Sequence, residues 1–114
     1  MYTYKAKIFN IVDGDTYDAI VDLGFNVSIT VRLRLDGIDT PETWRPKTEA
    51  ERKHGEECTA FVRAILENGT VTIHSTYQGA YSRYGATVIL PGGRILAEVL
   101  RDAGFEKRSS YIDQ

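Results

Sequence analysis

The sequence is poor in the residues that build disulfides, zinc sites and membrane spans. Cys58 is the single cysteine, so no internal disulfide can form, which fits a reducing compartment. With only 2 histidines beside it, the chain also lacks the usual ligands of zinc. The apolar runs are too short to cross a bilayer. Residues 1–7 lack the apolar core of a secretion signal, and we therefore expect a cytoplasmic protein without a membrane partner.

An excess of positive charge is also missing. Lysine and arginine total 14 against 16 acidic residues, which gives a formal net charge of −2. Non-specific nucleic-acid binders are usually basic, because the release of counterions from phosphates drives their affinity. Residues 43–53 are the exception, since four basic side chains there, Lys47 among them, accompany two acidic ones. The charge predicts local phosphate contact and argues against strong non-specific binding.

What remains is the composition of one globular domain over residues 1–114, with 42% hydrophobic residues and no repeat or linker. The spacing of apolar residues predicts five strands, at residues 3–12, 16–23, 27–35, 70–76 and 84–90. It also predicts one helix between an N-cap at Thr48 and Gly69, and a second over residues 95–103. Gly55 is expected to delay the regular start of the first helix. This order favours a mainly β fold with two helices, a small five-stranded Greek-key barrel of the OB type.

Two short acidic segments are the candidates for chemistry. Asp13 and Asp15 flank Gly14 in the first expected turn, and Asp39 follows the third strand. An aspartate-rich turn is common and by itself indicates only the end of a strand. Three aspartates at strand ends together favour a Ca²⁺ site, because calcium accepts oxygens from carboxylates, backbone carbonyls and water. The Thr40 carbonyl is a further candidate oxygen.

An arginine and a second type of carboxylate accompany these aspartates. Arg32 and Arg34 alternate with apolar residues on the third strand, so both point away from the core, usually into solvent. Arg34 precedes the Asp39 loop, where a guanidinium suits a phosphate group. Pro41 fixes the backbone before Glu42, whose carboxylate would align or deprotonate an attacking water. The whole set predicts a small metal-dependent phosphodiesterase.

Aromatic residues and a further arginine occur near expected loops. Arg83 precedes the fifth strand and has Tyr81 beside it, an arrangement typical of a loop cation with aromatic neighbours. Trp44 and Tyr111 are candidates for stacking on bases, although an aromatic residue at a loop edge more often packs. His54 and His74 are isolated, and neither is expected to be catalytic.

With these residues assembled, the chain resembles the staphylococcal nuclease (thermonuclease) family from about Tyr4 to Lys107. The resemblance rests on five segments in the family's order, residues 12–16, 34–42, 54–61, 81–83 and 93–104. It implies a Ca²⁺-dependent nuclease with an OB fold that hydrolyses DNA and RNA and leaves 3′-phosphates. Single-stranded or frayed nucleic acid is the expected partner.

The roles implied by the resemblance fall into three groups. Calcium binding falls to Asp15, Asp39 and the Thr40 carbonyl, with Asp13 near the metal shell. Catalysis falls to Arg34 and Arg83 as phosphate clamps and to Glu42 as general base. Contact with the nucleic acid falls to Lys47, Tyr81 and Tyr111.

The chain departs from the family pattern in two places. Ser82 stands where the family usually has glycine, and a rival placement would put Ala86 at the second arginine position. A single inserted residue later in the chain favours Arg83 instead. The sequence also stops shortly after Tyr111, where well-known members continue into a third helix, so we expect exposed apolar barrel surface and, with it, either a homodimer or a lower stability. The alternative from another class is a catalytically silent OB-fold module that binds nucleic acid or protein.

Overall fold

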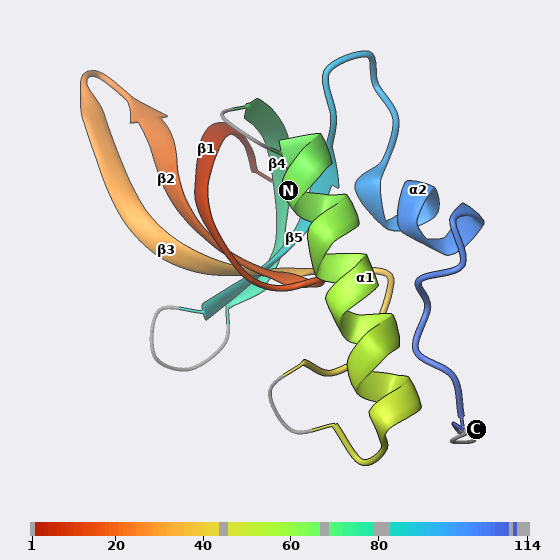
Figure 1. Ribbon diagram of the computed structural model, residues 1–114. Coiled ribbons are helices and arrows are strands. Elements are labelled where there is room, and N and C mark those ends of the chain that lie inside the picture. Colours follow the sequence, from red (N-terminus) through yellow and green to blue (C-terminus); the bar gives the residue numbers. More distant parts are fainter. Residues whose placement is uncertain (1, 44–45, 67–68, 79–82, 110, 112–114) are drawn as a thin grey trace.

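Five strands close into a barrel in the computed structural model, and two helices pack against it (Figure 1). The elements are β1 (Thr3–Asp13), β2 (Thr16–Gly24), β3 (Val27–Leu35), α1 (Glu49–Leu66), β4 (Thr70–Gln78), β5 (Arg83–Ile89) and α2 (Leu96–Asp102). The structure describes residues 2–43, 46–66, 69–78, 83–109 and 111. The predicted OB-type barrel is confirmed. Within those residues no helix combines the length and the apolar character needed to cross a membrane.

The order of strands around the barrel is β1-β2-β3-β5-β4. Neighbouring strands are antiparallel except for β3 and β5, which run parallel. The parallel pair sets Arg34 beside Gly85 and Leu35 beside Ala86. The end of β3, where the acidic loop begins, is therefore fixed against β5 as well as β2.

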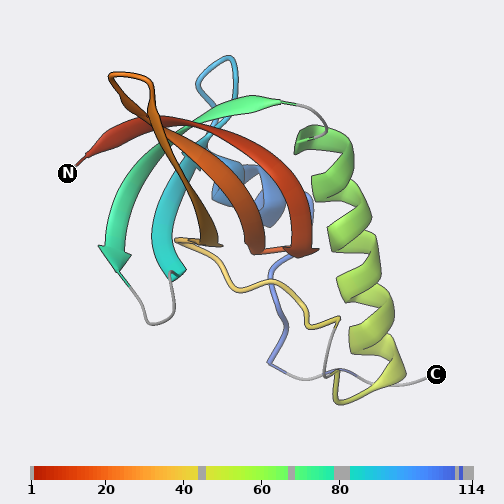
Figure 2. The ribbon, with the colours of Figure 1, turned by 90° about the vertical axis from the view of Figure 1, so that its left-hand side faces the viewer.

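Alternating side chains of all five strands fill the barrel, as period-two patterning requires. Those of β2 and β3 are Tyr17, Ala19, Val21, Val31, Leu33 and Leu35, all at most 6% exposed. From α1, Cys58, Val62 and Leu66 recur every fourth residue and are buried against the strands. Helix α1 thus closes one end of the barrel, as Figure 2 shows in side view.

Helix α1 begins where the sequence predicts, but Gly55 does not delay its regular start. The Thr48 hydroxyl accepts the Glu51 backbone N–H at 3.1 Å, which confirms the N-cap. The helix is continuous from Glu49 through Gly55, so the prediction of a delayed start is wrong. A Cβ at Gly55 would lie 2.8 Å from the Glu42 carbonyl oxygen. Glycine is needed there because the Glu42 backbone packs directly on the helix.

The hairpin of β2 and β3 extends beyond the barrel as a free arm, at the end opposite α1 (Figures 1 and 2). We call residues 22–30 the β2–β3 arm. Leu23 follows Val21 on the inner face as predicted, yet it is 38% exposed because no other strand covers the arm. The barrel therefore has two dissimilar ends, one closed by a helix and one open beneath an apolar arm.

Candidate functional site

The turn between β1 and β2 carries the first two acidic residues. Asp13 pairs with Thr16 across the turn, and the Asp13 carboxylate accepts the Gly14 N–H at 3.2 Å and the Thr43 hydroxyl at 2.7 Å. Burial raises the pKa of Asp13, and the nearby Asp15 charge adds to that effect, while the Thr43 hydrogen bond opposes it. Asp13 thus ties the turn to the loop after β3.

Gly14 allows this turn to lie close to the rest of the site. A Cβ at Gly14 would lie 2.6 Å from Cys58 Sγ and 2.8 Å from Thr40 Oγ1. Tyr17 is fully buried and its hydroxyl donates to the Gly14 carbonyl at 2.5 Å. Burial raises the Tyr17 pKa well above its ordinary value, so the hydroxyl stays protonated and remains a donor. Burial together with the Asp15 charge raises the Cys58 pKa to about 12, so the thiol is neutral packing material.

Asp15 is the carboxylate on which the two acidic segments meet. Its Oδ2 accepts the Thr40 backbone N–H at 3.1 Å, and its backbone carbonyl accepts the Leu35 N–H at 2.7 Å. The residue is only 9% exposed. These bonds hold the Asp15 carboxylate against the Thr40 backbone although 25 residues separate them in the chain.

Arg34 bridges the two segments through its guanidinium group. Its Nη2 lies 3.3 Å from Asp15 Oδ2 and forms a second ion pair with Asp39 Oδ1. Its Nη1 donates to the carbonyl oxygens of Leu35, at 2.6 Å, and Ile38, at 3.1 Å. One nitrogen therefore marks the point on which carboxylates from two separate turns converge.

The groove beside Arg34 is acidic. It has a volume of about 320 Å³ and is lined by Arg34, Leu35, Asp36, Gly37, Ile38, Asp39, Tyr77 and Glu106. Three carboxylates thus face a single cation, and the Asp39 side chain is 78% exposed. Such a groove repels phosphate unless a further positive charge is added.

The donor set suits a hard cation that keeps several waters. Among the residues described, no group of three or more His, Cys, Asp or Glu forms a preassembled metal cluster. Asp15 and Asp39 nevertheless offer two carboxylates within reach of one atom, and the Thr40 carbonyl belongs to the same loop. Calcium accepts such oxygen-only sets and completes its shell with water.

Helix α2 and the chain after it hold the acidic loop from the other side. The Lys107 N–H donates to the Asp39 carbonyl at 2.7 Å, and the Arg101 side chain donates to the Gly37 carbonyl. Further along, the Tyr111 hydroxyl lies 2.8 Å from His54 Nδ1, while His54 Nε2 lies 2.8 Å from the Gly104 carbonyl. His54, buried in α1, thereby anchors the C-terminal segment to the helix that supports the site.

Glu42 lies after Pro41 on the same loop. Pro41 is fully buried, and the Glu42 backbone rests on α1 at Gly55. Within the described part of the chain, the half-buried Glu42 carboxylate has no hydrogen bond or ion pair. The carboxylate is therefore held by its backbone and is available to a ligand.

Arg83 is the first residue of β5 and lies beside Arg32 on β3, two residue positions before the level of Arg34. It is exposed and pairs with Arg32, two residues before Arg34 on β3, a separation of about 7 Å along a strand. Ala86 pairs with Leu35 and is fully buried, so that position points into the core. Arg83 is not among the residues that line the groove, although it is the arginine of β5 whose side chain faces outward.

Lys47 and Tyr111, two further expected substrate contacts, are not among the described residues that line the groove. Lys47 is exposed just before α1, and Tyr111 is half-buried against His54 and the Arg108 guanidinium, 5.5 Å from its ring centre. Tyr81 and Trp44 lie outside the described residues. A contact of Lys47, Tyr81 or Tyr111 with nucleic acid therefore stays a prediction.

Three residues of the site were not singled out from the sequence. Tyr17, Thr43 and His54 fix the turn, the loop and the tail, respectively. Tyr17 looked like an ordinary inward strand position, and His54 like an isolated histidine. Their polar atoms acquire partners only when the chain is folded, so no local pattern in the sequence indicates these roles.

Comparison with known proteins adds to this geometry. Residues 32–113 match the family model described as "Staphylococcal nuclease homologue". The chain belongs to the staphylococcal nuclease family. It is similar to the thermonuclease of Staphylococcus hyicus, with 32% identity over 107 residues, which is 92% of this chain. The matched region spans 59% of that relative's length. The five-stranded barrel with two helices is consistent with this family, and the loop after β3 lies within the matched residues.

Proposed function

We propose that the protein is a calcium-dependent phosphodiesterase that hydrolyses DNA and RNA. The observation that carries the proposal is the convergence of Asp15 and Asp39, from two different turns, on the Arg34 guanidinium. Hard oxygen ligands next to a bidentate phosphate-binding group are what phosphodiester hydrolysis requires. Membership of the staphylococcal nuclease family supports the same reaction class.

The carboxylates of Asp15 and Asp39 and the Thr40 carbonyl would hold the calcium ion. Asp13 would lie near the metal shell without binding the ion directly, because its carboxylate already accepts two hydrogen bonds. A bound cation would supply the positive charge that the groove lacks, and it would draw the phosphate toward Arg34. We expect the binding of nucleic acid, as well as its cleavage, to depend on the cation.

Three side chains would carry the reaction. Arg34 would exchange its contact with Asp39 for contacts with two phosphate oxygens. Arg83 would hold the phosphate from β5, the strand next to β3. Glu42 would take a proton from the attacking water. The new bond joins the water oxygen to phosphorus and the bond between phosphorus and the 5′ oxygen breaks. The 5′ oxygen takes a proton from solvent, and Glu42 returns to solvent the proton that it took from the water. The products are a 3′-phosphate and a 5′-hydroxyl.

The substrate would be a single strand or a frayed end of DNA or RNA. Lys47 would contact the backbone of the strand, and Tyr81 and Tyr111 would stack on its bases.

The test is cleavage of a fluorescent single-stranded oligonucleotide with Ca²⁺, with Mg²⁺ and with EDTA. We expect cutting with calcium, loss with EDTA, and products whose 3′-phosphates are removed by a phosphatase. Glu42→Ser should abolish cutting and leave calcium-dependent binding of the oligonucleotide intact. Arg32→Ala is the matched control, because Arg32 lies on the same strand face and contacts Asp18 instead.

The silent OB-fold module is the second candidate. It is favoured by one observation, the placement of Arg83 outside the lining of the groove. Binding of the oligonucleotide without cutting under any metal would support that module and contradict the nuclease.

A further inference from the structure

The tip of the β2–β3 arm carries an aromatic residue that is exposed at a conformational cost. Gly24 pairs with Val27, so Phe25 and Asn26 form a two-residue turn, with φ angles of 52° and 62°. Asparagine tolerates this left-handed backbone, whereas for a bulky residue such as phenylalanine it is a true outlier. Phe25 is also 101% exposed and so gains no packing in return. A strained, fully exposed aromatic side chain points to a contact outside its own subunit.

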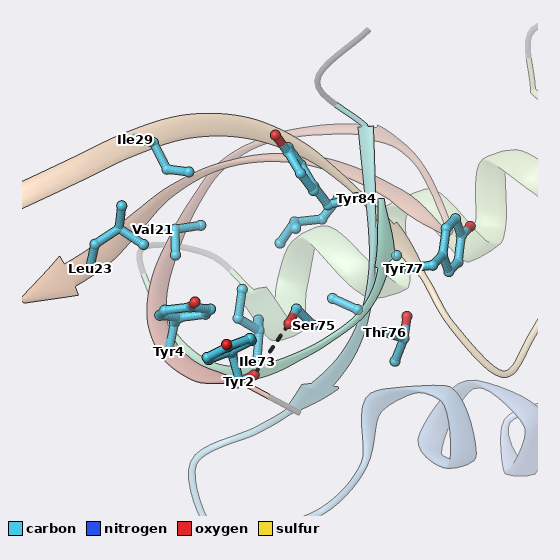
Figure 3. A pocket seen from close by; sticks show the side chains of 13 residues that line it. Tyr2, Tyr4, Val21, Leu23, Ile29, Ile73, Ser75, Thr76, Tyr77 and Tyr84 are labelled. Carbon is cyan, nitrogen blue, oxygen red and sulfur yellow. Dashed lines mark hydrogen bonds between the residues drawn. The ribbon is translucent and has the colours of Figure 1, made fainter. Parts of the chain in front are cut away.

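The same end of the molecule contains a cavity that matches such a side chain. The open mouth of the barrel has a volume of about 510 Å³ and is lined by Tyr2, Tyr4, Val21, Leu23, Ile29, Leu33, Ile73, Ser75, Thr76, Tyr77, Tyr84, Gly85 and Ala86. Figure 3 shows Tyr4 and Tyr84 on opposite sides of the mouth, with Ile29 and Leu23 of the arm along its edge. Ser75, a small residue beside Tyr2, also lines the mouth.

The chemistry of the mouth selects an apolar occupant. None of its thirteen lining residues is charged. A nucleic acid requires cations along its backbone, and the mouth offers none. The arm is similarly poor in charge, since Asp22 is the one charged residue among residues 22–30. Depletion of charge around aromatic residues is typical of the core of a protein–protein interface.

We propose that two copies of this chain form a closed dimer in which each Phe25 enters the open barrel mouth of the other copy. The projecting side chain and the cavity belong to the same chain, so a second copy is the partner for which both are already matched. A two-fold axis between the arms makes the two contacts identical, so that both barrel mouths are filled. The inner faces of the two arms, with Val27 and Ile29, would then face each other across the axis.

The exposed apolar surface supplies most of the area that this contact needs. Large apolar side chains of the arm and the mouth are exposed as follows: Tyr2 71%, Leu23 38%, Phe25 101%, Val27 51%, Ile29 42% and Tyr77 52%. Taking roughly 200 Å² for a whole aromatic side chain, they offer on the order of 600 Å² per copy. A stable interface needs about 800 Å² per partner, and the backbone and polar atoms of the arm supply the difference.

Sedimentation velocity tests the dimer on the full chain, in EDTA and without nucleic acid. We expect the wild type to sediment with the mass of a dimer once the protein concentration reaches roughly 100 µM. Phe25→Asn keeps a residue that tolerates the turn and removes the ring, and it should weaken dimerisation at least roughly thirty-fold, as loss of a central aromatic contact does. Phe9→Asn is the matched control, because Phe9 is 53% exposed on β1 and does not line the mouth. It should leave the dimer unchanged.

A second variant tests the cavity rather than the side chain that enters it. Ser75→Leu should fill part of the mouth and weaken dimerisation as Phe25→Asn does, with a circular dichroism spectrum like that of the wild type. A mixture of the two variants retains one intact contact and should form more dimer than either variant alone. A monomeric wild type, or a dimer that Phe25→Asn leaves intact, would overturn the proposal.

Discussion

Arg32 and Arg34 are two residues apart on β3 and project from the same face, yet their surroundings differ entirely. Arg32 forms a bidentate pair with Asp18 on the adjacent strand, at 2.9 and 3.3 Å. Arg34 instead contacts two carboxylates and two backbone carbonyls that come from the β1–β2 turn, from β3 itself and from the loop after it. A pairing within one sheet stabilises that sheet. A guanidinium on which separate segments converge holds those segments together, and in the proposed function it would also bind the phosphate.

The largest difference between the two arginines should appear in turnover. Arg34→Lys removes the planar fork that can hold two phosphate oxygens while keeping the charge. We expect cleavage to fall by on the order of a hundredfold or more. Arg32→Lys should retain activity within about threefold, since only the Asp18 pair changes. Equal losses in steady-state cleavage by the two variants would remove the distinction.

The next effect concerns the turn that brings Asp15 to Arg34. Gly14→Ala would force a Cβ within 2.6 Å of Cys58 Sγ and 2.8 Å of Thr40 Oγ1. We expect the free energy of unfolding to fall by about 2 kcal/mol, the usual cost of overpacking a tight site. Urea denaturation gives the value. A Gly14→Ala variant as stable as the wild type would mean that the turn and the Thr40 loop do not need this close approach.

A smaller effect distinguishes the acidic partners of the two arginines. Asp39→Asn should raise the calcium concentration for half-maximal cleavage by about tenfold, because one anionic ligand is lost. Asp18→Asn should leave that concentration unchanged, since Asp18 accepts bonds only from Arg32 and Asn10 among the described residues. A calcium titration of both variants makes the comparison. A shift in the Asp18 variant would place the cation elsewhere.

The smallest effect is the pH dependence of the Asp18 pair. The hydrogen bonds from Arg32 lower the pKa of Asp18. A lowered folded pKa stabilises the protein above the ordinary pKa of about 4 and loses that contribution as the pH falls through the folded value. Arg32 is largely solvated, so we expect Asp18→Asn to cost less than about 1 kcal/mol at neutral pH. Urea denaturation gives the free energies of unfolding of the variant and the wild type, and the difference between them should vanish in acid. A difference that grows as the pH falls would contradict the prediction.

The elements of the fold could be predicted because each one has its own local pattern. The third strand falls at residues 27–35 in both prediction and structure, and Thr48 caps the first helix as expected. The alternation of apolar and polar residues places Arg32 and Arg34 on one face of β3, but it does not distinguish the surroundings of the two side chains. Their different partners depend on how the β1–β2 turn and the Asp39 loop meet, and strand periodicity carries no information about that meeting.

The supporting contacts of the site were beyond prediction for a related reason. Thr43 donates to Asp13 across 30 residues of chain, and His54 contacts Tyr111 across 57. Nothing in the immediate neighbourhood of these residues indicates a partner. Gly55 shows the converse, since a residue that looks unfavourable for a helix is required by a backbone that packs against it from elsewhere.

The hydrogen bond from the Lys107 N–H to the Asp39 carbonyl couples the ordering of the Asp39 loop to the ordering of the segment after α2. If the segment from Gly104 to Tyr111 detaches from α1, the loop loses that restraint at the same moment. Deuterium uptake at the Lys107 and Thr40 amides should therefore proceed at similar rates, set by one shared opening. A protease that trims this segment would remove one restraint on the Asp39 loop and leave the contacts of Arg34 and Arg101 with that loop in place.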